Sequence, residues 1–138
     1  MSSFEQLFDL KVKEQLALAR KIRNQFVERT MGKIIDDTPH LTGALKGSWH
    51  SEVGAPSTDS STRLTGKDGA EPKAELKAAI ERWPDEGSLF VSNRERHAEG
   101  VEFDGWASNQ APMGMVRVNI VGLSGDIVKL TADSGRME

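Results

Sequence analysis

Residues 2–39, SSFEQLFDLKVKEQLALARKIRNQFVERTMGKIIDDTP, form the stretch of sequence that decides the fold. Its apolar residues recur mostly three or four positions apart, which places them on one face of an α-helix. The members of this stripe are Phe4, Phe8, Val12, Leu16, Ala19, Ile22, Phe26 and Ile34, and Leu7, Leu18 and Val27 widen it. The spacing therefore predicts one long helix over residues 1–37.

Both ends of this helix carry sequence signals. Ser2 and Glu5 have the spacing of a capping box, in which two side chains satisfy the free backbone N–H groups of a helix start. Pro39 disfavours helical geometry at Thr38 and predicts that the helix ends there.

The length of the helix has a consequence for packing. Roughly 33 residues rising 1.5 Å each span about 50 Å, whereas a compact domain of this size has a radius of gyration of about 14 Å. We therefore expect the helix to extend beyond its own domain and a neighbouring subunit to bury the surplus apolar surface. The alternative is a helix kinked at Gly32, or bent, that packs wholly on its own sheet.

The middle of the chain predicts shorter elements. Residues 44–54 indicate a strand anchored by Leu45, Trp49 and Val53. The small and polar residues 55–70 predict a mobile loop.

A short helix is expected over residues 72–83, because Pro72 suits a first helical position and Pro84 would stop the helix. Leu76, Ile80 and Trp83 would form its apolar face.

The last part of the chain predicts two further strands. Residues 88–92 indicate a buried strand and residues 115–121 another, joined by an irregular connection over 93–113. For the tail over residues 122–138, the sequence is compatible both with a short helix and with a hairpin. The sequence thus predicts a single α+β domain over residues 1–138. A long N-terminal helix packs on a small, mostly antiparallel sheet, with one further short helix.

Composition limits the classes of function. The 138 residues suit one domain, and 37% hydrophobic residues with 13 glycines are typical of a globular protein. Eighteen Lys and Arg against 21 Asp and Glu give a net charge of −3, which argues against a large basic DNA-binding surface. The absence of cysteine excludes disulfides and thiol nucleophiles. No apolar run reaches the ~20 residues of a membrane span, and we expect neither a membrane anchor nor a signal peptide.

The sequence does not assemble an active site. His40, His50 and His97 are far apart in the sequence. The pattern favours solvent-facing or locally bonded histidines over a metal site that these histidines would build with Glu102. Nucleophile-elbow, Walker and dinucleotide motifs are absent. We predict a protein that is not an enzyme, with no cofactor, no metal and no small-molecule substrate.

Two segments combine glycines or a proline with a strand signal. Residues 42–49, TGALKGSW, place two glycines before a tryptophan, and residues 110–117, QAPMGMVR, place a proline and a glycine before a strand. The plain interpretation is turn chemistry together with core anchoring.

At these segments the sequence resembles the bacteriophage tail-completion or neck proteins related to lambda minor tail protein Z. The resemblance covers roughly residues 38–121, and the segment 110–117 is its most specific part. The matching positions include Thr42, Gly43, Leu45, Trp49, Asn93, Glu102, Gln110, Pro112, Gly114, Met115 and Arg117. Two positions depart from the family pattern: His97 stands where the family usually has Tyr, and Asp104 is inserted before Gly105.

The resemblance implies a structural protein of a tailed phage virion, assembled in the host cytoplasm, that completes the tail and joins it to the head. The expected partners are further copies of the chain, six in a ring, and neighbouring neck or tail proteins. Genome DNA would pass through the lumen without sequence-specific binding. A head-closure or tail-terminator ring is the alternative within the virion. A small DNA-binding regulator that uses the basic residues of the first helix is the alternative from another class.

Overall fold

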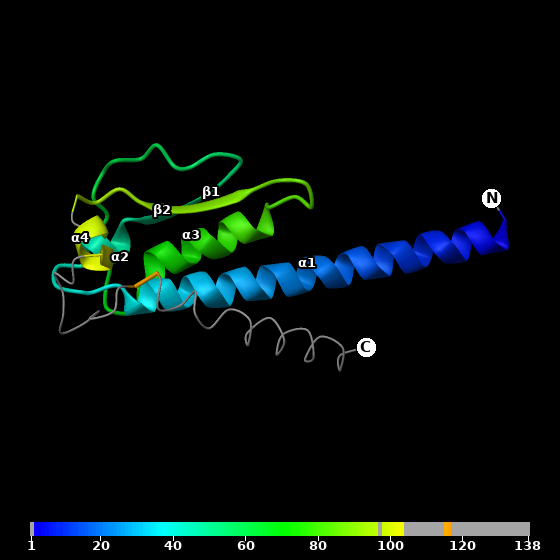
Figure 1. The fold of residues 1–138 in the computed structure, drawn as a ribbon, viewed down its shortest axis with the longest axis horizontal. Helices are drawn as coiled ribbons and strands as arrows, with labels where there is room; N and C mark the ends of the chain where they lie inside the picture. Colours follow the sequence, from blue (N-terminus) through cyan, green and yellow to red (C-terminus); the bar gives the residue numbers. More distant parts are fainter. Residues whose placement is uncertain (1, 97, 104–114, 117–138) are drawn as a thin grey trace.

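The structure, a computed structural model, describes residues 2–96, 98–103 and 115–116. Its elements are α1 (Ser3–Asp37), α2 (Ala44–Gly47), β1 (Trp49–Val53), α3 (Ala70–Glu81), β2 (Leu89–Asn93) and α4 (Ala98–Phe103). A long N-terminal helix, a two-stranded antiparallel sheet and further short helices confirm the predicted α+β class (Figure 1).

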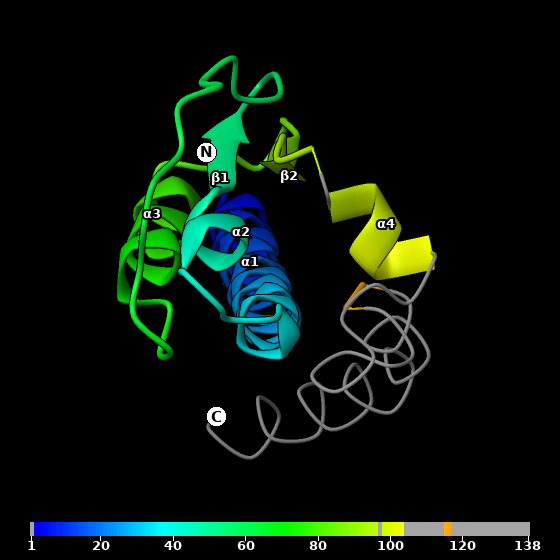
Figure 2. The same cartoon turned by 90° about the vertical axis from the view of Figure 1, so that its left-hand side faces the viewer.

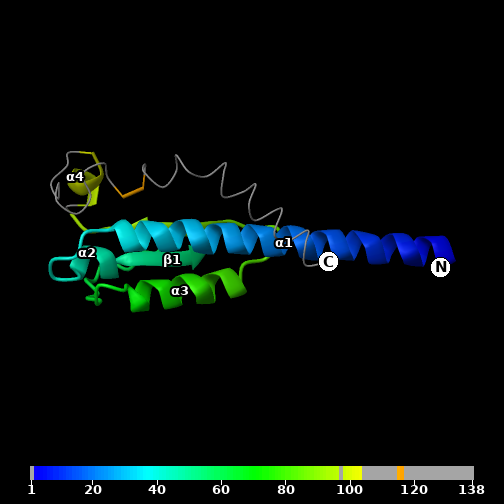
Figure 3. The same cartoon turned by 90° about the horizontal axis from the view of Figure 1, so that it is seen from below.

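Helix α1 begins and ends where the sequence predicted. The Ser2 hydroxyl accepts a hydrogen bond from the Glu5 N–H at 3.2 Å, and the Glu5 carboxylate accepts one from the Ser2 N–H at 3.1 Å. Thr38 has extended backbone geometry, and its hydroxyl donates to the Ile34 carbonyl at 2.7 Å. The helix continues through Gly32 without interruption (Figure 3), so the kink at that position is wrong.

The remaining elements pack around the C-terminal half of α1. Helix α3 lies beside α1, and the sheet lies over the two helices (Figure 2). Strands β1 and β2 are antiparallel, with Trp49 opposite Asn93 and Val53 opposite Leu89. This arrangement places the core at one end of α1 and leaves the N-terminal half of the helix projecting from it (Figure 1).

The strand expected over residues 44–54 is shorter than predicted. Its first residues, Ala44–Gly47, form the helical turn α2, and the strand begins only at Trp49. The four-residue spacing of Leu45 and Trp49 fits one face of a helix and one face of a strand equally well, which explains the error. Gly43 precedes the turn with φ 88°, a left-handed geometry that glycine adopts without strain.

Helix α3 starts two residues earlier and ends two residues earlier than the predicted range. Gly69, with φ 64°, precedes its first residue, so Pro72 is the third helical residue instead of the first. Proline is tolerated there because the first four N–H groups of a helix have no acceptor within it. Trp83 lies beyond the helix, and its indole N–H donates to the Gly87 carbonyl at 2.9 Å.

Three further expectations concern the C-terminal part. Strand β2 is half-buried along its length, because in the sheet of the described residues it pairs only with β1, so the prediction of a buried strand is wrong as to burial. Helix α4 interrupts the connection that was expected to be irregular. Met115 and Val116 form a bend instead of a strand, and residues 117–121 and 122–138 lie outside the described residues, as does His97.

The core joins residues from every helix and from β1. Its buried members are Ile34, Ile35, Leu45, Trp49, Leu76, Ala79, Ile80, Val101 and Met115. Val27 and Met31 of α1 pack against this cluster, together with Leu89 and Val91 of β2. Within the described part of the chain, no residue of α1 before Val27 belongs to this cluster.

Candidate functional site

Trp49 fixes the junction between α1 and β1. Its indole N–H donates to the Thr38 hydroxyl at 2.8 Å, and both side chains are buried. The same hydroxyl donates to the last turn of α1, so one threonine links the helix end to the first residue of the sheet. A buried indole needs such an acceptor, because an unpaired N–H costs free energy.

The two glycines of the 42–49 segment allow close backbone contact. A Cβ at Gly43 would lie 2.1 Å from the Thr65 carbonyl oxygen, and a Cβ at Gly47 would lie 1.9 Å from the Arg63 carbonyl oxygen. Thr42 completes the turn by accepting a hydrogen bond from the Ala44 N–H at 3.3 Å. The segment 63–65 therefore lies directly against α2, with no room for a side chain between them.

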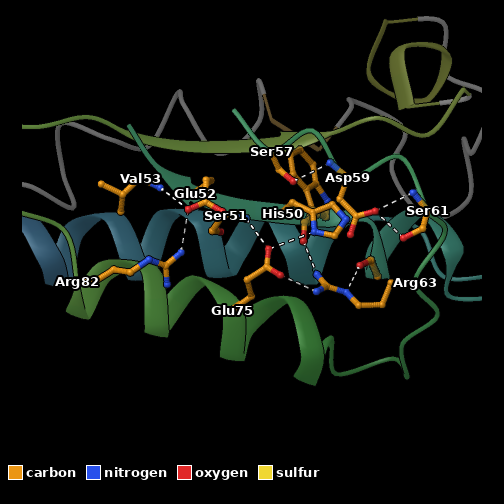
Figure 4. A network of polar contacts seen from close by, with 12 residues as sticks. His50, Ser51, Glu52, Val53, Ser57, Asp59, Ser61, Arg63, Glu75 and Arg82 are labelled. Atoms are coloured by element: carbon orange, nitrogen blue, oxygen red, sulfur yellow. Dashed lines mark hydrogen bonds and ion pairs between the residues drawn. The ribbon is translucent and has the colours of Figure 1, made fainter. Parts of the chain in front are cut away.

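Arg63 holds this part of the loop in place. Its guanidinium donates to the Gly47 carbonyl at 2.7 Å, to the Trp49 carbonyl at 2.6 Å and to Glu75 at 2.8 Å (Figure 4). One side chain thus connects the loop with α2, β1 and α3. The loop predicted over residues 55–70 is irregular, as expected, and its mobility stays a prediction for the residues before Arg63.

Glu75 is the carboxylate at the centre of the same network. It accepts a hydrogen bond from the Ser51 N–H at 2.7 Å and lies 3.2 Å from Nδ1 of His50 (Figure 4). Burial raises the pKa of Glu75, but the Ser51 N–H and the Arg63 guanidinium together outweigh burial, so this pKa lies below its usual value. His50 is therefore locally bonded, and so is His40, whose Nε2 lies 2.9 Å from the Thr65 carbonyl.

Asn93 and Glu102 bind backbone groups at the other side of the core. The Asn93 amide donates to the Leu45 carbonyl at 2.7 Å, which ties β2 to α2. The Glu102 carboxylate is buried and accepts hydrogen bonds from the Met115 and Val116 N–H groups at 2.7 and 2.8 Å. The matching residues of the segments 39–49, 89–93, 98–103 and 115–116 thus meet in one structural unit.

The described motif residues hold backbone and core together, and Trp49, Asn93, Glu102 and Met115 also line a hollow of about 330 Å³. Among the residues that the structure describes, no three His, Asp or Glu side chains are grouped to bind a metal ion. None of the described helices combines the length and hydropathy that crossing a membrane requires. The other four matching positions, Gln110, Pro112, Gly114 and Arg117, lie outside the described residues.

Most of the exposed large apolar side chains among the described residues belong to the projecting half of α1. Every residue from Ser2 to Ala17 is exposed. The six large apolar side chains there are Phe4, Leu7, Phe8, Leu10, Val12 and Leu16, and each is between 41% and 75% exposed. Phe4 and Phe8 stack on each other with ring centroids 6.4 Å apart. Contiguous apolar surface of this kind marks interaction sites in soluble proteins.

Polar contacts attach α1 to the domain just beyond this half. Arg20 forms two hydrogen bonds with Asp85, at 2.6 and 2.7 Å, which raise the pKa of Arg20 and lower that of Asp85. Arg23 donates to the carbonyls of Pro84 and Trp83, and its guanidinium lies 3.7 Å from the centre of the Trp83 ring. The position of the projecting half is therefore fixed by the turn after α3.

Several structural residues were not predicted from the sequence. Arg63 and Glu75 stand in a polar loop and on a helix surface, where a solvated charge is the usual interpretation. Lys46 is buried, donates to the Asp36 and Lys67 carbonyls, and has a pKa lowered by burial. The available signal was the pair Gly43 and Gly47, because a glycine outside a turn indicates close backbone approach.

Comparison with protein-family models, with curated proteins and with solved structures finds no match to this chain.

Proposed function

We propose that this chain is a structural subunit of a tailed phage virion that completes the tail and joins it to the head as part of a ring around the DNA channel. The observation that carries the proposal is the projecting half of α1, because its exposed apolar side chains require a protein partner. A further support is that the described matching residues of the phage-like segments act on backbone and core, as expected of a protein whose role is architectural.

The charges of α1 favour this proposal over a DNA-binding regulator. Such a regulator would use the basic residues of α1 to contact phosphates. Arg20 and Arg23 are instead engaged with Asp85, Trp83 and Pro84, and Lys11 pairs with Glu14 at 3.4 Å. These contacts compete with phosphate binding. A DNA affinity that falls steeply with rising salt would be needed to support the DNA-binding regulator instead.

The test is to stop translation of this reading frame in the phage genome that carries it and to image the lysate by electron microscopy. Packaged heads beside separate tails, or tails with abnormal ends, are the expected result. Empty or leaking heads would instead favour the head-closure alternative. Normal infectious particles would overturn a role in the virion altogether.

A further inference from the structure

His50 on β1 has one ring nitrogen that bonds to none of the described residues. The residue is 5% exposed, and its Nδ1 lies 3.2 Å from the Glu75 carboxylate. Its Nε2 is buried and has no hydrogen-bond partner in the described part of the chain. A buried nitrogen without a partner is unfavourable, which indicates that His50 has a second state in which Nε2 is bonded.

Residues 55–61, which we call the covering segment, lie over this nitrogen. Asp59, Ser60 and Ser61 are exposed, and they line a hollow of about 10 Å³ whose wall includes His50. Figure 4 shows Asp59 and Ser61 beside the imidazole ring. A hollow of this size has room for about one water molecule, so the partner of Nε2 has to come from the protein or from water.

The hydrogen bonds of the covering segment stay inside it, as far as the described residues go. The Asp59 N–H donates to the Ser57 hydroxyl at 3.2 Å. Ser61 donates to Oδ1 of Asp59 through its N–H at 2.9 Å and through its hydroxyl at 2.6 Å. The first hydrogen bond to another element is that of Thr62, which donates to Glu95 at 3.0 Å. A bond between His50 and Asp59 would therefore attach a segment that is otherwise free to move.

Charged groups face His50 from each element around it. The carboxylates are those of Glu75 on α3, Asp59 in the covering segment and Glu95 after β2, and the guanidinium groups are those of Arg63 and Arg94. The Ser61 hydroxyl and N–H, with smaller contributions from His50 and Arg63, lower the pKa of Asp59, so this side chain is a carboxylate at neutral pH. A protonated ring would thus lie between two carboxylates, those of Glu75 and Asp59.

The two protonation states of His50 differ in what Nε2 can bind. The Glu75 carboxylate accepts from Nδ1, so Nε2 of the neutral ring is an acceptor and cannot bond to the Asp59 carboxylate. The protonated ring has a donor at both nitrogens, and Nε2 can then donate to Oδ2 of Asp59, the oxygen that Ser61 does not use. Ser92 lies directly opposite His50, and its buried hydroxyl, also without a partner among the described residues, is a donor for the neutral ring.

We propose that His50 is a pH-sensitive switch for the covering segment. Protonation lets Nε2 donate to Asp59 and holds the segment on β1. Loss of the proton removes this hydrogen bond and releases the segment. Histidine is the side chain that ordinarily changes its charge between about pH 5 and 8, so the switch works in that range. It acts whatever role the chain has in a virion and stands apart from the proposed function.

A nitroxide spin label on Thr58→Cys in the full-length protein measures the mobility of the covering segment by electron paramagnetic resonance. The chain has no cysteine of its own, and Thr58 is exposed and does not line the hollow. The label should be immobilised at about pH 5 and mobile at about pH 8, with a transition that fits one proton. Circular dichroism checks that the fold is unchanged over this range. Equal mobility at both pH values overturns the switch.

Asp59→Asn in the labelled protein distinguishes this hydrogen bond from a general effect of pH. The amide keeps Oδ1 for Ser61 and places an N–H donor where Oδ2 was, so it can bond to the neutral ring and should immobilise the label at about pH 8 as well. Asp68→Asn is the matched control, because Oδ1 of Asp68 also accepts from a backbone N–H two residues along, that of Ala70 at 3.3 Å, but does not line the hollow. This control should keep the wild-type response. A wild-type response in Asp59→Asn overturns the proposal.

His50→Gln tests the titrating group itself. Glutamine does not change its charge in this range, so the mobility of the label should be the same at both pH values. A transition that persists in a folded His50→Gln protein assigns it to another group and overturns the role of His50. If this buried substitution unfolds the protein, the exposed Asp59 variant decides alone. Normal virions after loss of the gene would refute the proposed function and leave the switch intact, whereas a label insensitive to pH refutes the switch alone.

Discussion

The side chain of Arg63 connects three separate elements of the fold. It donates hydrogen bonds to residues of α2, β1 and α3, and its side chain is 27% exposed. Replacing Arg63 with methionine keeps much of the apolar stem but removes the guanidinium donor from the Gly47 and Trp49 carbonyls and from one oxygen of Glu75, whose other oxygen keeps the Ser51 N–H.

We expect Arg63→Met to lower the free energy of unfolding by about 2–3 kcal/mol, because hydrogen bonds from charged donors are among the stronger ones. Urea denaturation measures this loss. Arg82→Met is the control, since its ion pair with Glu52 is exposed and 3.3 Å long. Equal losses for the two variants would contradict the special role of Arg63.

Glu75 makes the free energy of unfolding decrease as the pH falls into the acid range. Its pKa is below the usual value in the folded protein, so its contribution is present above the unfolded pKa of about 4.3 and is lost as the pH falls through the folded pKa. Glu75→Gln should therefore have a free energy of unfolding that falls less steeply than the wild type below about pH 4. Denaturation curves at pH 7 and in the acid range would show it. Parallel pH profiles would refute the assignment to Glu75.

At the scale of elements, we expect opposite effects on stability when alanine replaces Gly47 in α2 and Gly32 in α1. Gly47→Ala places a Cβ 1.9 Å from the Arg63 carbonyl, so α2 and the loop must separate. We expect a loss of about 1–3 kcal/mol in the free energy of unfolding.

Gly32→Ala is the matched control inside α1. No atom lies within 4 Å of a Cβ there, and alanine is the better helix former. We expect a gain of about 0.5–1 kcal/mol, visible as a higher Tm in thermal denaturation. A loss at Gly32 would indicate a role for its flexibility that the straight helix does not explain.

The same scale shows what sequence patterns can predict. Helix α1 was predicted to within a few residues, because its periodicity and both end signals are local properties. The start of the strand at Trp49 was not predicted. Gly43 and Gly47 pack against the backbone of residues 63–65, and this contact is between segments distant in sequence. Arg63, Glu75 and the Glu102 carboxylate could not be predicted as structural, since their partners are backbone groups that only the fold brings near.

At the scale of the whole molecule, the domain should not need the projecting half of α1. Residues 2–17 are all exposed, and the core begins further along the helix. Removing residues 2–17 should change the free energy of unfolding by less than about 1 kcal/mol, because exposed positions away from packing contribute little. Sedimentation of the shortened chain should also show no self-association. A domain that unfolds on truncation would contradict the division between core and projection.

The unbroken course of α1 also has a mechanical consequence. The helix has 35 residues, and its C-terminal end is embedded in the core while its N-terminal end is free of it. At 1.5 Å per residue it is a lever arm of about 50 Å. A tilt of the domain by about 5° would move the far end by about 4 Å, which exceeds the helix shifts of ~1–2 Å that accompany switching at subunit interfaces. A small rotation of the domain thus becomes a larger displacement at the N-terminal end of α1, and helix α1 transmits it to a partner bound there.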